Sequence, residues 1–234
     1  MAELIKINAH GLSNSFRIPL HMTVHDTFPL PMKTHIIGMM AAAMGIERSS
    51  SYIHYMYSNI MVGITGKTLS RYYDLITLYK FKGEKYPEIS QLQRQMNYEN
   101  NYIIYVYTEN KLLHKIYEYL KNPVFALYLG KASEIINIKN VEIINKELLK
   151  NGKITISNTV IPFKIDDFDI EDVNNGNITP FTNYHVPSAF SLEKDYRVPI
   201  NFYDITFIGD IKISININKE FTAINDGDLD VILR

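Results

Sequence analysis

The sequence predicts an α+β protein with a ferredoxin-like (RRM-like) first domain in the order βαββαβ, followed by a smaller β-rich domain. Strand-like segments of residues 1–149 are interrupted by two segments with helical periodicity, which gives that order. Residues 150–234 contain short Ile-rich segments separated by turns rich in Asp, Asn and Gly. A chain of 234 residues with 46% hydrophobic residues is long enough to bury a core of this size.

The first predicted strand is Glu3–Ala9, in which Ile5, Ile7 and Ala9 share one face. Leu4 is an exception, because it falls on the opposite, polar face. The segment then continues in an extended form toward Pro19. The other strand-like segments of this domain are Asn59–Ile64, Tyr72–Phe81, Tyr102–Tyr107 and Phe125–Leu129.

Two segments have the periodicity of amphipathic helices. Lys33–Met44 follows a Pro-rich approach and carries an apolar stripe before the stop signal of Gly45; the stripe is Ile36, Met39, Met40 and Ala43. Leu112–Leu120 precedes Pro123 and has an inner face of Leu112, Leu113, Ile116 and Leu120.

Residues Lys82–Asn101 are polar and predict a projecting, thumb-like loop or hairpin inserted in the first domain. The loop and its approach carry Lys80, Lys82, Lys85 and Arg94 near several tyrosines. Lysine and arginine neutralise phosphates and tyrosine stacks on unpaired bases, so this composition indicates RNA contact. A solvated polar loop is the alternative.

Four short strands are predicted in the second domain: Lys153–Ser157, Val160–Ile165, Tyr203–Phe207 and Lys212–Ile217. Between them lies an acidic run that includes Asp166, Asp167, Asp169, Glu171 and Asp172. The run lacks the Gly and terminal Glu of an EF-hand, so we interpret it as a solvated face that repels RNA or meets a basic partner protein.

Net charge is −1 for the whole chain, but it is distributed unevenly. Residues 1–131 carry 14 Lys+Arg and 9 Asp+Glu, whereas residues 132–234 carry 10 and 16. The first half is therefore mildly basic and the second acidic, which is a hint about partners. The absence of Cys excludes disulfides, Cys-ligated metals and thiol catalysis, and with no signal peptide or membrane span in view a cytoplasmic location is expected.

Two blocks carry a resemblance to a known family. The first comprises SFRIP at Ser15–Pro19, TFPLP at Thr27–Pro31 and the helix at Ile36–Ile46; the second is LYLGKASE at Leu127–Glu134. Both resemble the CRISPR-associated Cas-five family, the RAMP subunit of type I Cascade complexes, in which an FR-x-P strand precedes a Pro-rich entry and a small-residue helix. The family often has two adjacent prolines before the helix, and this chain departs from that pattern.

The resemblance implies a structural RNA-binding role in antiviral defence. Such a subunit grips the 5′ handle of the crRNA, caps the Cascade filament, contacts the backbone and large subunits, and meets target DNA only through the complex. It also implies a thumb at Lys82–Asn101 that kinks the guide. The length and two-part layout suggest the subtype I-B group.

Three further groups are candidate RNA contacts. Arg17 lies in an apolar segment, where an arginine is either paired structurally or faces a ligand. Lys33, Thr34 and His35 open the first helix, where free N–H groups favour an anion, although ordinary capping explains them as well. A small-residue turn with a nearby cation suits a phosphate, and a plain turn is the commoner outcome; its residues are Gly130, Lys131 and Ser133.

No cofactor, metal site or catalytic residue is predicted. The histidines form no HExxH motif, and Pro19 disfavours a helix that could join His21 and His25 at one metal. Two alternatives stay open: a metal-independent endoribonuclease that processes repeat RNA, with His114, Lys115 and Tyr117 as candidates, and a scaffold that binds only protein.

Overall fold

A computed structural model describes residues 1–19, 21, 23–80, 86–174, 181–193 and 196–234. Its helices are α1 (Lys33–Ala43), α2 (Ser51–Asn59), α3 (Asn110–Lys121) and the short 3₁₀ helix η1 (Ile165–Asp167). Its strands in the first 149 residues are β1 (Ala2–Asn14), β2 (Val24–His25), β3 (Met61–Lys80), β4 (Glu88–Tyr107) and β5 (Ile136–Lys146). The remaining strands are β6 (Lys153–Ile156), β7 (Thr159–Ile161), β8 (Phe168–Asn174), β9 (Thr182–Glu193), β10 (Tyr196–Ile208), β11 (Lys212–Ile217), β12 (Thr222–Asp226) and β13 (Leu229–Leu233).

The largest sheet in the described part of the chain has eight strands. Its order is β5-β1-β4-β3-β7-β10-β9, with β2 added beside β4. β1 is antiparallel to both β4 and β5, and β3 is antiparallel to β4. β3 joins the strands before residue 150 to the part after it, through the pairing of Thr65 with Thr159 and through two backbone hydrogen bonds exchanged by Val62 and Arg234. The protein is therefore α+β, as the sequence predicts, and the division into two domains near residue 149 stays a prediction.

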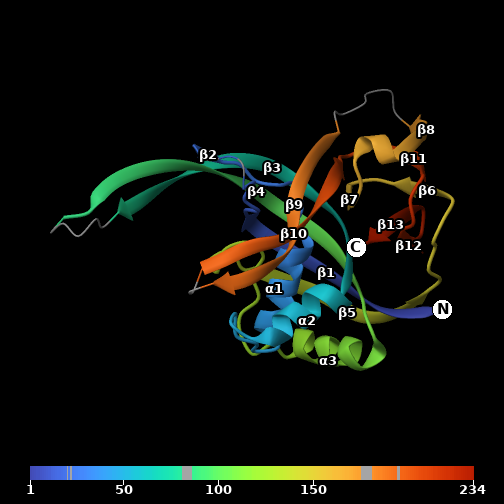
Figure 1. Ribbon diagram of the computed structural model, residues 1–234, viewed down its shortest axis with the longest axis horizontal. Coiled ribbons are helices and arrows are strands. Elements are labelled where there is room, and N and C mark those ends of the chain that lie inside the picture. The colour runs from blue at the N-terminus through green and yellow to red at the C-terminus, as the bar shows by residue number, and fades with distance from the viewer. Residues whose placement is uncertain (20, 22, 81–85, 175–180, 194–195) are drawn as a thin grey trace.

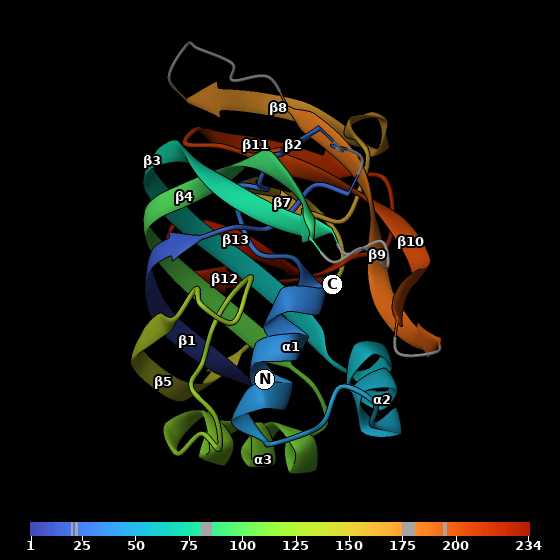
Figure 2. The same cartoon turned by 90° about the vertical axis from the view of Figure 1, so that its left-hand side faces the viewer.

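One face of this sheet is covered by α1 and α3 (Figure 2). β1 alternates because Ile5, Ile7 and Ala9 point into the core on this face. The predicted helix at Lys33–Met44 is confirmed at Lys33–Ala43, with its whole apolar stripe buried. The helix predicted at Leu112–Leu120 is confirmed within Asn110–Lys121, again with all four inner-face residues buried.

The β12–β13 hairpin covers the opposite face. Leu4 is fully buried there, in a small core with Tyr105 and the hairpin residues Val231 and Leu233. Lys6 pairs with Asp226 of the hairpin at 2.7 Å. Leu4 thus breaks the alternation of β1 because both faces of the strand are covered, which sequence periodicity alone does not reveal.

β3 and β4, of 20 residues each, form a hairpin whose outer part extends away from the body (Figure 1). The hairpin interpretation is confirmed, and the loop interpretation is wrong for Glu88–Asn101, which is strand. The two strands predicted at Asn59–Ile64 and Tyr72–Phe81 belong to this single strand β3 between Met61 and Lys80, whereas Asn59 ends α2. Tyr73 and Tyr79 are 57% and 60% exposed, so no buried face imposes a regular alternation on the outer ribbon.

Several elements carry too weak a pattern to be read from the sequence. α2 buries only Met56 and Tyr57, and β5 is a half-exposed edge strand. Phe125–Leu129 is not a strand but an irregular segment with one bridge, from Tyr128 to Ile135. The short strands predicted after residue 150 are confirmed in β6, β10 and β11. The strand predicted at Val160–Ile165 is confirmed only as far as Ile161 in β7, and it is wrong beyond that point because the chain turns into η1 at Ile165. No helix of the described residues is long and apolar enough to cross a membrane.

Gly63 of β3 allows the β12–β13 hairpin to lie against the sheet. A Cβ at this position would lie 2.8 Å from Cγ1 of Val231 and 3.1 Å from the carbonyl oxygen of Ile232. We expect Gly63→Ala to displace the hairpin and lower the free energy of unfolding by about 1–3 kcal/mol in urea denaturation. The control is Gly38→Ala in α1, where a Cβ meets nothing within 4 Å and about 1 kcal/mol of stabilisation is expected. Equal stabilities of the two variants would contradict this packing.

Candidate functional site

A buried carboxylate organises the turn that follows Leu129. Glu134 is 4% exposed, and its Oε2 accepts hydrogen bonds from the N–H groups of Ser15 at 2.7 Å and Lys131 at 3.1 Å. Its Oε1 accepts from the Ser15 hydroxyl at 2.7 Å. The carboxylate thereby joins the end of β1 to the Gly130–Ser133 turn, two segments 119 residues apart in the sequence.

Gly130 is required by this arrangement. Its φ is +104°, a region that favours glycine. A Cβ would lie 2.0 Å from Oε2 of Glu134 and 2.5 Å from the carbonyl oxygen of Ser15. The positive φ and these close contacts therefore explain the glycine of the predicted phosphate-binding turn without reference to a ligand.

Arg94 connects the turn to the β3–β4 hairpin. Its Nη1 donates to Oε1 of Glu134 at 3.3 Å, and its Nη2 donates to Oδ2 of Asp74 at 2.7 Å. Its side chain is only 12% exposed. Two carboxylates therefore hold a guanidinium that the sequence offers as an RNA contact, and its evident role is to fix the base of the hairpin.

Two cations and a histidine gather at the surface of this turn. Arg17 and Lys131 are exposed, and His25 of β2 is half-buried. Burial, followed by the nearby Arg17, Lys131 and Arg94, lowers the pKa of His25. Burial and Arg94 likewise lower the pKa of Lys131, partly opposed by Glu134 and Asp74. Positive charge on each of these side chains disfavours protonation of its neighbours, and a bound anion would offset this repulsion.

A cavity of about 410 Å³ lies beside these cations and against the first turns of α1. Arg17, Thr34, His35 and Gly130 contribute to its lining, together with Phe190 of β9. Thr34 is 7% exposed, and Nδ1 of His35 accepts a hydrogen bond from the Met32 N–H at 3.2 Å. The cavity thus combines polar and cationic groups with an apolar wall.

The structure brings five of the predicted residues to this site: Arg17, Thr34, His35, Gly130 and Lys131. Ser133 is exposed on the same turn. Lys82 and Lys85 lie outside the described residues, as does the side chain of Lys80. Sequence reasoning misses His25 and Glu134; the only signal for Glu134 is its place at the end of the second sequence block.

Lys33 is not part of the cavity lining, and its ammonium lies near the side chain of Arg234 instead. Burial, and secondarily the charge of Arg234, lowers the pKa of Lys33 to about 8. Nε and Nη2 of Arg234 are buried and make no hydrogen bond with the described residues. This pair of cations is therefore a cost to folding that the rest of the core offsets.

A family model described as "CRISPR-associated protein (Cas_Cas5)" matches residues 6–182, most of the chain and all of the cavity's lining except the β9 residues Val186, Pro187 and Phe190. The chain belongs to the CRISPR-associated Cas5 family. A comparison with curated proteins gives no match.

Solved structures similar to this Cas5 family member share its fold at low sequence identity. A chain of a "CRISPR RNA-guided surveillance complex" aligns with a TM-score of 0.59 and 14% identity, over 92% of this chain and 91% of that one. A CRISPR protein from Archaeoglobus fulgidus aligns with a TM-score of 0.61 and 12% identity, over 99% of both chains. A chain of a Type III-B Cmr-beta complex bound to cognate target RNA aligns at 0.50 and 10%, over 90% and 86%. At these identities the likeness concerns the fold alone.

Within the described residues of this Cas5 family member, no three His, Asp or Glu side chains gather in a way that could hold a metal ion. His21 makes an ion pair with Asp26, in which Nδ1 and Oδ2 are 2.6 Å apart. The acidic run lies mainly in η1 and β8, where Asp167 pairs with Lys219 and Glu171 with Lys153, both at 2.8 Å.

The contact between Glu134 and Arg94 is open to a double-mutant cycle. Replacing Glu134 by Gln leaves Arg94 without a buried counter-charge, so we expect Glu134→Gln to lower the free energy of unfolding by about 3 kcal/mol. In an Arg94→Met background the same change is expected to cost at least 1 kcal/mol less, measured by urea denaturation. The control is Glu171→Gln, which removes an exposed partner of Lys153 and is expected to cost about 0.5 kcal/mol or less. Additive effects of the two substitutions would contradict the coupling.

Lys33 gives a prediction about pH. Its pKa of about 8 lies below the ordinary value of 10.5, so the folded protein binds this proton more weakly than the unfolded chain does. The resulting penalty is complete below pH 8 and disappears as the pH rises toward 10.5. We expect Lys33→Met to stabilise the protein at pH 7 by at most about 3 kcal/mol, with an advantage over wild type that shrinks between pH 8 and 10.5. Lys153→Met, which removes an exposed and ion-paired lysine, is the control; an advantage of Lys33→Met that is constant with pH would refute the assignment.

Proposed function

We propose that this protein is a non-catalytic, RNA-binding subunit of a type I CRISPR surveillance complex. We also propose that the site formed by Arg17, His25, Gly130 and Lys131, here named the Arg17–Lys131 site, holds the 5′ handle of the crRNA. The observation that carries the proposal is the gathering of Arg17, His25 and Lys131 around a glycine turn, beside a cavity. Exposed cations and backbone close to a turn are the groups that bind phosphates. Family membership gives this cationic surface its context.

The proposed fold of the first domain is ferredoxin-like. Its support is the all-antiparallel order β5-β1-β4-β3, with α1 following β1 and α3 following β4 on one face of the sheet. That order is the one expected of a βαββαβ chain. In this arrangement the β3–β4 hairpin corresponds to the thumb, and its exposed tyrosines suit stacking against unpaired bases.

The candidates for a nuclease site have other partners, which favours a non-catalytic role. His114 lies 3.2 Å from a carboxylate oxygen of Glu3. Lys115 lies over the ring of Tyr52 at 5.3 Å from its centre, whereas Tyr117 lies beneath Lys121. General acid–base catalysis requires such groups to converge on one phosphate, and these three make separate contacts.

The proposed partners follow from the same role. A chain of similar fold comes from a surveillance complex, and another comes from a complex bound to target RNA. We propose that the present protein likewise assembles with a backbone subunit and a large subunit, in a complex of the subtype I-B group, and meets target DNA only through that complex. The acidic run on η1 and β8 adjoins a separate three-stranded sheet and suits a basic protein surface.

The proposal is tested by RNA binding as a function of salt. We expect Arg17→Ala/Lys131→Ala to weaken binding of repeat-derived single-stranded RNA about tenfold or more, and to reduce the slope of log affinity against log salt by about 1.4, because each phosphate contact contributes roughly 0.7. Lys153→Ala/Lys219→Ala removes the same charge from the acidic surface and is the matched control. The RNA should be recovered uncut. Equal affinities and equal salt slopes for the two double variants would contradict the proposal.

A further inference from the structure

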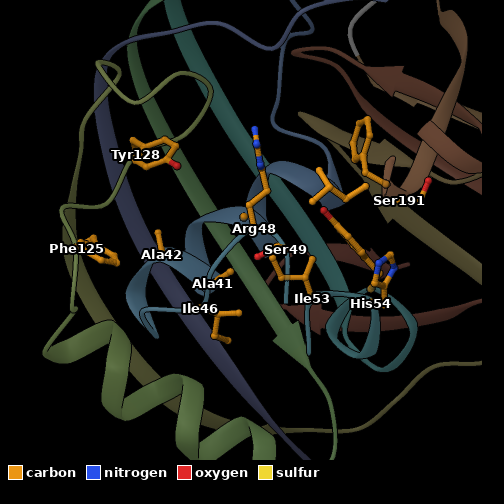
Figure 3. A pocket seen from close by; sticks show the side chains of 14 residues that line it. Ala41, Ala42, Ile46, Arg48, Ser49, Ile53, His54, Phe125, Tyr128 and Ser191 are labelled. Carbon is orange, nitrogen blue, oxygen red and sulfur yellow. The ribbon is translucent and has the colours of Figure 1, made fainter. Parts of the chain in front are cut away.

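A second cavity, of about 290 Å³, lies farther along α1 (Figure 3). Its floor is formed by Ala41 and Ala42 of α1 and by Ile46, and Ile53 and His54 of α2 line one end. Figure 3 shows Tyr128 and Phe125 on one side and Ser191 of β9 on the other, with Arg48 between them. Five separate segments of the chain therefore build one pocket.

This pocket lies directly beside the cavity at the Arg17–Lys131 site. The two share Gly38, Tyr128 and Phe190 in their linings. Together they form a groove along the outer face of α1, from its first turn to the residues just after its end. A chain-like ligand held by phosphate contacts at the first cavity would therefore extend into the second.

Gly38 stands where the two cavities meet, in the middle of α1. It is exposed, it has no positive φ, and a Cβ there would meet nothing within 4 Å. A glycine inside a helix costs about 1 kcal/mol relative to alanine, and neither a turn nor internal packing requires it here. Its evident consequence is that the helix backbone is open to close approach by a ligand.

The lining has the chemistry of a nucleotide site. Aromatic rings of Phe125, Tyr128 and Phe190 stand around small aliphatic residues, which suits the flat faces of a base. Arg48 and His54 can meet a phosphate or a base edge, and the lining contains no Asp or Glu. An acidic side chain of a partner protein would suit the cations too, but the position directly beside the Arg17–Lys131 site favours RNA.

We propose that this pocket receives one unpaired nucleotide of the RNA, with its base packed over Ala41 and Ala42 against the aromatic wall and its phosphate toward Arg48. This inference rests on the proposed function, because it assumes that the same strand binds at Arg17 and Lys131. The pocket would select a nucleotide by the shape of its base, whereas the Arg17–Lys131 site would bind the phosphate backbone of the RNA.

The test uses the full-length protein and repeat-derived single-stranded RNA in which 2-aminopurine replaces one nucleotide at a time. Stacking in the pocket should quench the fluorescence of the probe at one position in wild type and in the control variant Lys153→Ala/Lys219→Ala, whose substitutions lie on the acidic surface. Ala42→Phe and Gly38→Leu fill the groove and should restore the fluorescence at that position. They should also weaken binding about tenfold and reduce the salt slope by at most about 0.7, because only the phosphate contact at Arg48 is lost while those at Arg17 and Lys131 persist. Thermal unfolding of each variant confirms that it is folded.

Four outcomes would overturn the inference. Tight RNA binding with no quenched position in wild type refutes the pocket and leaves the proposed function intact. Unchanged quenching in both folded groove variants also refutes it. If Ala42→Phe binds RNA normally but fails to assemble with a purified neighbouring subunit, the pocket binds a protein and not a nucleotide. Absence of RNA binding by wild type refutes the proposed function and this inference together.

Discussion

The buried carboxylate of Glu134 is the contact on which the candidate site depends. It receives two backbone N–H groups, one hydroxyl and one guanidinium, and so fastens the end of β1, the Gly130 turn and the β3–β4 hairpin to one point. A buried carboxylate is costly unless its oxygens are satisfied, and here Ser15, Lys131 and Arg94 satisfy them. The exposed cations of the site stand on this rigid support.

Burial of apolar side chains on both faces stabilises the large sheet. The helices α1 and α3 bury one face, and the β12–β13 hairpin, the last strands of the described chain, returns to bury part of the other. The hairpin can lie this close because Gly63 has no side chain, and the ion pair of Lys6 with Asp226 fixes its position. The C-terminal segment thereby completes a core that the first strands begin.

The outer face of α1 has a different character from its inner face. The inner face is an apolar stripe packed on the sheet, whereas the outer face carries Gly38 and Ala42 between β9 and the segment at residues 125–130. A helix flanked in this way leaves a groove instead of a smooth surface. The proposed RNA path follows that groove, and the acidic strand β8 belongs to a separate sheet.

The sequence by itself determined α1 and α3, the inward face of β1 and the short strands after residue 150, because periodic apolar residues specify which side of an element is buried. Local chemistry placed Gly130 and Arg17 among the candidates, because one lies in a small-residue turn beside a lysine and the other is an arginine in an apolar segment. Only the tertiary structure decided that Arg94 is held by two carboxylates, that Lys33 lies beside Arg234, and that His25 joins the site. These outcomes depend on contacts between segments far apart in the chain, and local patterning carries no information about which charges meet.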